Sequence, residues 1–178
     1  IVDMSNMFYN SQSISIDVSS FDTSKVTNMS GMFYGTTGGM VEPESLESSN
    51  AINVPQVYSS SQVPEIKGLE SFDTSNVTDM SGMFYNCKVA NLDLSNFNTS
   101  KVTNMSSMFH GNVSKSLNLS SFDTSNVTNM GNMFASSAAT SLDVSNFDTS
   151  KVTNMSQMFS SSKATEIKGL ENFNTSRV

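Results

Sequence analysis

Apolar side chains recur along this chain at fixed intervals, separated by Ser, Thr, Asn and Asp. The stretch from Phe147 to Phe159 shows the pattern clearly, with Val152, Met155 and Met158 as apolar positions among polar ones. Similar stretches return every 25 or 26 residues from one end of the chain to the other. Self-similarity at a fixed period is the sequence signature of a repeat array. We therefore expect a stack of coils, each of which buries its apolar face on the next.

Equivalent positions in successive repeats form columns of similar residues. The Val column contains Ile1, Val26, Ala51, Val77, Val102, Val127, Val152 and Val178. Its steps are 25 residues, except for two steps of 26 that contain the variant Ile-Lys-Gly-Leu. A Gly beside an inserted residue predicts a bulge or a tighter bend at the end of a strand. Residues 1–178 are thus interpreted as one array of about seven coils.

The repeat between Phe33 and Phe84 departs from the common pattern. Tyr58 replaces the second Phe there, and Pro43 falls within the expected strand. Pro cannot donate a hydrogen bond to a strand ladder. We interpret residues 36–62 as a diverged second coil, and we expect it to be the least regular one.

Each repeat contains a short alternation of apolar and polar residues, which predicts a half-buried strand. The strands are expected at 14–18, 41–43, 66–67, 92–94, 117–119, 142–144 and 167–168. Stacked in register, they would form one parallel sheet. The Asp-Thr-Ser group that follows is typical of helix starts, and Val26, Met29 and Phe33 come after it at helical spacing, which favours a short α- or 3₁₀-helix. In the alternative, Val-Thr-x-Met is extended and only the Met-Phe part turns.

Two polar columns lie beside the apolar ones. A Ser recurs after Asp-Thr, as at Ser24 and Ser150, and an Asn recurs after Val-Thr, as at Asn28 and Asn154. Polar groups repeated at one position beside a core are best explained by hydrogen bonds to turn backbone. We expect a structural role for both columns.

The repeat reads Leu-Asp-Leu-Ser-x-Phe-Asp-Thr-Ser-x-Val-Thr-x-Met-x-x-Met-Phe, and it resembles the bacterial surface protein 26-residue repeat, also classed as domain of unknown function 285. The resemblance covers essentially the whole chain. It implies a solenoid similar to leucine-rich repeats, α/β or mostly β, with one short parallel strand and a short helix or 3₁₀ turn per coil. A parallel β-helix is the alternative. The resemblance also implies an extracellular, adhesin-like module of a lipoprotein or wall-anchored protein on the bacterial cell surface.

Composition narrows the choice of partners. The net charge of -7 argues against a nucleic-acid partner. A single cysteine, Cys87, excludes an internal disulfide framework and a cysteine-rich metal site. No stretch approaches the roughly 18 apolar residues that span a bilayer, so we expect no membrane insertion of this segment. Since both ends fall in the Val column without polar caps, we interpret the chain as a fragment whose caps, signal and anchor lie outside it.

Residues suited to catalysis or metal binding are few. His110 occupies a position that holds Tyr, Ser or Ala in other repeats, so we expect a surface position and no Ser-His-Asp or Cys-His site. An acidic column at coil spacing is interrupted by Asn98 and Asn174 and lacks an EF-hand pattern. No catalytic, cofactor-binding or metal-binding residue is therefore assigned, and we expect no enzymatic activity.

A binding module is the leading hypothesis, with a host or matrix protein, or a glycan, as its partner. The candidate contacts are the outward residues of the sheet and three tyrosines at one repeat position, namely Asp17, Glu42, Lys67, Asp93, Asn118, Asp143, Lys168, Tyr9, Tyr34 and Tyr85. Exposed tyrosines are favoured contact residues. A structural spacer that binds no ligand is the alternative, because the coils are so uniform. A third possibility is ice binding by the row Thr23, Thr74, Thr99, Thr124, Thr149 and Thr175.

Overall fold

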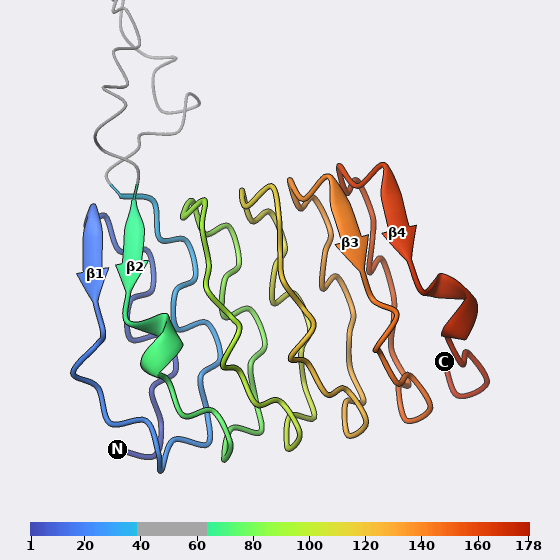
Figure 1. Ribbon diagram of the computed structural model, residues 1–178, viewed down its shortest axis with the longest axis horizontal. Helices are drawn as coiled ribbons and strands as arrows, with labels where there is room; N and C mark the ends of the chain where they lie inside the picture. Colours follow the sequence, from blue (N-terminus) through green and yellow to red (C-terminus); the bar gives the residue numbers. More distant parts are fainter. Residues whose placement is uncertain (39–63) are drawn as a thin grey trace, which may run out of the picture.

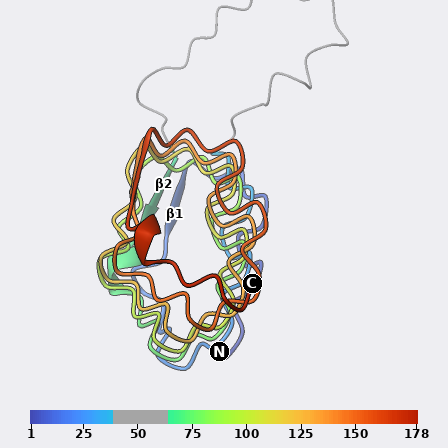
Figure 2. The ribbon, with the colours of Figure 1, turned by 90° about the vertical axis from the view of Figure 1, so that its right-hand side faces the viewer.

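The computed structural model describes residues 1–38 and 64–178, and in it successive turns of the chain lie side by side along one axis (Figure 1). We call one such turn a coil and name it by its residue in the Val column. Viewed along the axis, the coils superpose around a shared interior (Figure 2). The two termini therefore lie at opposite ends of the stack.

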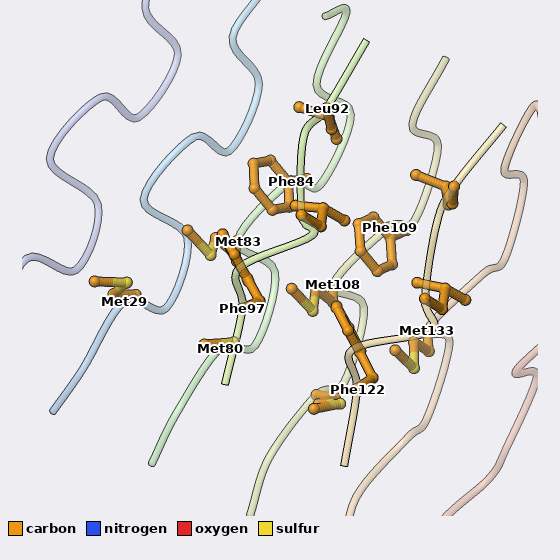
Figure 3. Packing of buried hydrophobic residues seen from close by; sticks show 14 of the residues in the cluster. Met29, Met80, Met83, Phe84, Leu92, Phe97, Met108, Phe109, Phe122 and Met133 are labelled. Atoms are coloured by element: carbon orange, nitrogen blue, oxygen red, sulfur yellow. The ribbon is translucent and has the colours of Figure 1, made fainter. Parts of the chain in front are cut away.

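The interior is filled by the columns that the sequence pattern places inside. The Val side chains of the Val26, Val77, Val102, Val127 and Val152 coils are fully buried. The rings of Phe33, Phe84, Phe109 and Phe134 follow one another at centroid distances of 5.7 to 5.8 Å. Figure 3 shows Phe84 and Phe109 in this interior, together with buried Met side chains from neighbouring coils. Because each such residue contributes about 1.5 to 3 kcal/mol on burial, these columns are the main source of stability.

Among the described residues, four short strands lie on one side of the stack (Figure 1). Strand β1 (Ser15–Asp17) pairs in parallel with β2 (Glu65–Lys67), and β3 (Ser141–Asp143) pairs in parallel with β4 (Glu166–Lys168). The middle residue of each strand points inward, whereas its two neighbours are exposed. The alternation of apolar and polar residues thus predicts the orientation of these strands correctly.

The single continuous sheet expected from the sequence is not present among the described residues. Residues 92–94 and 117–119 lie in the strand position but form no strand, so two two-stranded sheets remain. No main-chain hydrogen bond joins residues 92–94 to residues 117–119. The expected strand at 41–43 falls outside the described residues.

The Val-Thr-x-Met segment is extended, as in the second interpretation of the sequence. The prediction of a short helix over this segment is therefore wrong. Parallel bridges join Asp3, Asn28, Asp79, Asn104, Asn129 and Asn154 in one line along the stack. In this line the Met29 N–H donates to the Asp79 carbonyl at 2.9 Å instead of to a carbonyl four residues earlier. The Asp22 carboxylate accepts hydrogen bonds from the Ser24 N–H and hydroxyl, which forms a turn in place of a helix cap.

Both recurring polar columns have the structural role that the sequence predicts. In the Asn column, the Asn28 side chain accepts a hydrogen bond from the Ser30 N–H at 3.0 Å, and Asn154 does the same for Ser156 at 2.9 Å. In the Ser column, Ser150 donates its N–H to Asp148. Each of these bonds gives a partner to a main-chain N–H group that is not paired in a helix or a sheet.

The Met-Phe half of each coil is a run of turns that needs left-handed backbone. One such column holds Asn6, Gly31, Gly82, Ser107, Asn132 and Gln157, with φ between 54° and 59°. This conformation lets alternate N–H groups reach the next coil, as Gly31 donates to the Ser81 carbonyl and Phe33 to the Met83 carbonyl. Asn and Gly tolerate it at least cost.

The extra residue of the two 26-residue steps makes a tighter bend, one of the two outcomes expected. Gly68 and Gly169 adopt φ of 89° and 91° and are followed by 3₁₀ helices η2 (Leu69–Ser71) and η3 (Leu170–Asn172). Since these two helices occur only at the variant repeats, the expectation of a short helix in every coil is not met in the described residues.

The coils of Val26 and Val77 are direct neighbours. Asn28 bridges to Asp79, and the rings of Phe33 and Phe84 stack at 5.7 Å. The sequence predicts a diverged coil at 36–62 between them, and most of that coil lies outside the described residues. Among the described residues, the two flanking coils are in contact with each other instead.

Candidate binding site

Three tyrosines and one histidine form a stack of rings on the surface, which we call the aromatic row. The rings of Tyr9 and Tyr34 lie 4.6 Å apart with planes 16° from parallel, and those of Tyr34 and Tyr85 lie 4.3 Å apart at 1°. The ring of His110 continues the row 4.5 Å from Tyr85 at 7°. Because the tyrosines share one repeat position, their rings contact one another in the stack.

Main-chain hydrogen bonds within each coil and between neighbouring coils hold the backbone of the aromatic row. The Tyr34 N–H donates to the Gly31 carbonyl at 3.0 Å within its own coil, and the Tyr34 carbonyl accepts from the Asn10 N–H at 2.7 Å. The Tyr85 carbonyl accepts from the Gly35 N–H at 2.7 Å. Tyr34, Tyr85 and His110 each follow a buried Phe of the interior, and Tyr9 follows the partly buried Phe8. The rings are thus positioned by the coils before any ligand arrives.

The aromatic row is partly exposed and uncharged. Tyr9 is 50% exposed, and Tyr34, Tyr85 and His110 are half-buried. Burial, and then the neighbouring Tyr85 and Tyr9, raise the pKa of Tyr34 above its ordinary value of 10.0. Its phenol group therefore stays protonated at neutral pH and can both donate and accept a hydrogen bond.

His110 differs from its sequence-based description as an ordinary surface residue. Its ring is half-buried and its Nδ1 atom is buried without a hydrogen-bond partner. Burial lowers the pKa of His110 below its ordinary value of 6.5, so the imidazole is neutral at physiological pH. Sequence reasoning missed its place in the aromatic row, although it shares the repeat position of the tyrosines and is itself aromatic.

A shallow groove of about 390 Å³ runs beside the aromatic row across four coils. It is lined by Asn6, Tyr9, Ser30, Gly31, Tyr34, Ser81, Gly82, Tyr85, Ser106 and Ser107. A Cβ atom at Gly82 would be in ordinary van der Waals contact with the side chains of Tyr34 and Tyr85, at 3.8 and 3.9 Å, so a side chain can be added here beside the rings. Gly31 is more confined, because a Cβ there would meet the Asn6 side chain.

The sequence matches a family model described as Mycoplasma protein of unknown function, DUF285, over residues 1–63 and 52–173. These two matches together span nearly all of the repeats. The chain belongs to the DUF285 family. The resemblance seen in the repeat itself is thereby confirmed, and the family is a bacterial one whose function is unknown. No curated protein and no solved structure matches the chain.

The outward residues of the strands form a second candidate surface of this DUF285 chain. Asp17 lies opposite Lys67, and Asp143 lies opposite Lys168, in the two strand pairs. Asp93 and Asn118 are exposed between these pairs without belonging to a strand, and Glu42 lies outside the described residues. The structure therefore places these residues on one side but in two separate pairs, not in one continuous row.

The acids of this second surface are already used by their own coils. The Asp17 carboxylate accepts from the Ser19 hydroxyl at 2.6 Å, and Asp93 accepts from the Ser95 hydroxyl at 2.6 Å. These hydroxyl bonds, and then the serine N–H groups, lower the pKa of both carboxyls. The acids stabilise turns in the coil, which makes this surface a weaker ligand site than the aromatic row.

Five of the six threonines suggested for ice binding are inside the stack, and only Thr175, in the last coil, is exposed. Thr23, Thr74, Thr99, Thr124 and Thr149 are each at most 2% exposed. The Thr23 hydroxyl accepts from the Asp73 N–H at 2.8 Å, and the Thr74 hydroxyl donates to the Asn98 carbonyl at 3.0 Å. Their hydroxyl groups therefore join neighbouring coils, and this row cannot face ice.

Other reactive groups are few in the part of the chain that the structure describes. Burial raises the pKa of Cys87 to about 12, so its side chain is a thiol and not a nucleophilic thiolate. Across residues 1–38 and 64–178, no group of three His, Cys, Asp or Glu side chains is placed to hold a metal ion. Within the same residues we find no helix of sufficient length and apolarity to cross a membrane.

Proposed function

We propose that this DUF285 chain is a non-enzymatic, extracellular binding module of a bacterial surface protein. Its ligand, a host or matrix protein or a glycan, would lie along the groove beside the aromatic row. The observation that carries the proposal is the ordered stack of Tyr9, Tyr34, Tyr85 and His110 next to open space.

The fold itself does not require aromatic residues at this position. The equivalent residues of the last two coils are Ala135 and Ser160, and both coils keep the same bridges and the Phe column, in which Phe134 is buried and Phe159 is partly buried. Four aromatic rings in succession therefore need a reason other than stability. Exposed Tyr side chains supply large amphipathic contact area at low entropic cost, which makes them frequent binding residues.

The rigidity of the aromatic row also favours binding. Main-chain hydrogen bonds between coils fix each ring position, as described for Tyr34. A surface ordered before association loses little conformational entropy when a ligand arrives. The same rigidity in a solenoid produces extended surfaces of the kind that repeat proteins commonly use to bind partners.

We further propose that the stack of coils is a solenoid of the leucine-rich-repeat type. The period of 25 to 26 residues lies within the range of such repeats. Short parallel strands on one side, such as β1 and β2, followed by turns on the other, support this assignment. A parallel β-helix is the second candidate, because the line of bridges through Asn28 is a second parallel contact between coils.

A spacer that binds nothing is the competing function. The near identity of the coils favours it, since a stalk needs only length and stiffness. The two functions differ in what happens at the aromatic row, because a spacer would be indifferent to the loss of the tyrosines.

The test is a screen of the 178-residue chain on arrays of glycans and matrix proteins. For any ligand found, we expect the triple variant Tyr9→Ser, Tyr34→Ser, Tyr85→Ser to bind at least tenfold more weakly, because the contact area is lost. Ser160 already occupies this position, so the variant should fold, and a thermal melt checks this. The matched control is Lys67→Ser with Lys168→Ser on the strand surface, which should keep full affinity.

Two results would contradict the proposal. If no ligand binds the unmodified chain, the spacer is the better description. If the triple variant binds normally while the lysine variant loses affinity, the strand surface is the site and the aromatic row is not.

A further inference from the structure

We infer that the groove beside the aromatic row takes an uncharged, hydroxyl-rich polymer, namely a neutral glycan chain lying parallel to the stack axis. This inference rests on the proposed binding function and names the ligand class for the same site. Four properties of the groove carry it: its charge, its hydrogen-bonding groups, its main-chain bonds and its length.

The groove is electrically neutral. None of the described residues that line it carries a charged side chain, although the whole chain has 16 acidic and 9 basic residues. The raised pKa of Tyr34 keeps its phenol uncharged at neutral pH. A charged ligand would lose water here without gaining a partner of opposite charge, which is unfavourable. Neutral ligands are therefore selected over anionic glycans and charged peptides.

The polar groups of the groove suit a ligand that both donates and accepts hydrogen bonds. The Tyr and Ser hydroxyls can do both, and the Asn6 amide offers one acceptor and one donor group. The rings cover one another's faces, so their edges and hydroxyls form the wall. Because ring edges carry the positive end of the aromatic quadrupole, they favour contact with oxygen atoms.

The main chain under the groove is already paired, which argues against an added peptide strand. The N–H groups of Gly31, Gly82 and Ser107 each donate to the next coil at 2.8 Å. Strand addition needs an exposed edge with unpaired main-chain groups. In addition, an extended peptide repeats its side-chain pattern about every 6.6 to 6.8 Å, out of step with strands about 4.8 Å apart.

The length and openness of the groove favour a polymer over a small molecule. It crosses four coils and offers a Ser at each of the three steps Ser30, Ser81 and Ser106. Small ligands are usually buried in closed pockets, whereas this groove is shallow. A polymer of like units can instead repeat one contact from coil to coil.

The repeat provides a variant that fills the groove without disturbing the backbone. Position 82 is left-handed, with φ of 59°, and its column holds Asn at Asn6 and Asn132. Gly82→Asn would place a side chain in the groove, with its Cβ atom 3.8 Å from the Tyr34 side chain and 3.9 Å from the Tyr85 side chain. Asn132→Gly is the matched control, because it makes the reverse change in the same column outside the groove.

The experiment measures binding of the full chain to neutral gluco-, manno- and N-acetylglucosamine oligomers, to sulfated oligomers and to matrix proteins, by array and titration calorimetry. We expect the neutral oligomers to bind with an affinity that changes less than twofold between 0.05 and 0.5 M salt, since screening acts only on charges. Gly82→Asn should weaken this binding at least tenfold, and Asn132→Gly should leave it unchanged.

Each other outcome overturns a defined part of the inference. Binding of only charged glycans or proteins, still sensitive to Gly82→Asn, would refute the ligand class but keep the binding function. Binding of neutral oligomers that is insensitive to Gly82→Asn would refute the groove as their site. Absence of any ligand would refute the ligand class and the proposed function together.

Discussion

Single polar residues hold the turns of each coil, and both Asp and Asn accept the hydrogen bond that does this. The Asp123 carboxylate accepts from the Ser125 N–H at 2.9 Å, and the Asn98 amide oxygen accepts from the Ser100 N–H at 3.1 Å. The charge of the Asp is therefore not needed for the turn. The hydrogen bonds from the Ser125 hydroxyl and N–H lower the pKa of the Asp123 carboxyl, because they favour its ionised form.

The lowered pKa values of the Asp carboxyls predict how acid affects stability. The pKa values of Asp123 and Asp148 lie below the ordinary 3.8 in the folded chain, chiefly because of the Ser125 and Ser150 hydroxyls. Their contribution is present above about pH 3.8 and is lost as the pH falls through the folded pKa values. We expect Asp123→Asn with Asp148→Asn to be less stable than the parent at pH 7, because this contribution is absent, and to lose less stability between pH 7 and pH 3, measured by urea unfolding.

The reverse substitution is the control for the acid prediction. Asn98→Asp adds a carboxylate at an equivalent turn and should increase the loss of stability on acidification. An identical loss in the parent and both variants would show that these carboxylates do not govern the acid response.

At the scale of the elements, the 3₁₀ helices η2 and η3 depend on the glycine before each of them. Gly68 has φ of 89° and lies against the Ser19 main chain of the adjacent coil. A Cβ atom there would meet the Ser19 backbone, and it would lie 2.8 Å from the Ser19 Cβ. The glycine therefore serves both the left-handed backbone and the close approach of two coils.

Substitution of this glycine should be costly. We expect Gly68→Ala to reduce the free energy of unfolding by at least about 1 to 2 kcal/mol, the cost of a left-handed non-glycine residue, with further loss from displacing Ser19. Gly131→Ser is the control, since its column holds Ser5, Ser30, Ser81, Ser106 and Ser156. Chemical denaturation of both variants decides the matter, and equal stability of the two would contradict the close approach.

At the scale of the whole molecule, stability depends on the order in which coils are stacked. Each coil donates main-chain hydrogen bonds to a neighbour and buries its Phe against the Phe of that neighbour. The coil of Val26 makes these contacts with the coil of Val77, including the bond from the Thr78 N–H to the Thr27 carbonyl at 2.8 Å.

This arrangement predicts the effect of removing one whole coil. Deletion of residues 101–125 joins Ser100 to Asn126 at equivalent repeat positions, so the coils on either side can restore the same contacts. We expect a folded protein whose urea m-value is lower by one coil's buried surface. An unchanged m-value would show that residues 101–125 do not pack as a coil of the stack.

The sequence by itself determined the period, the membership of each column and the inward face of most columns. Each is a local property, because the same residue type returns at the same position and the burial of Val26 or Phe33 follows from its chemistry. The three tyrosines of the candidate site could also be named in advance. The groove could not, because it depends on how residues of four coils are spaced next to one another.

Only the tertiary structure decided the questions that depend on distant partners. Whether Val-Thr-x-Met is helical or extended is settled by the bond from Met29 to Asp79, and helical spacing in the sequence contains no information about that bond. The burial of Thr23 likewise depends on its bond to Asp73, 50 residues away. The contact between the Val26 coil and the Val77 coil likewise depends on bonds between residues that are far apart in the sequence. Hydrogen bonds between coils join residues 24 or more positions apart, so a local pattern cannot specify them.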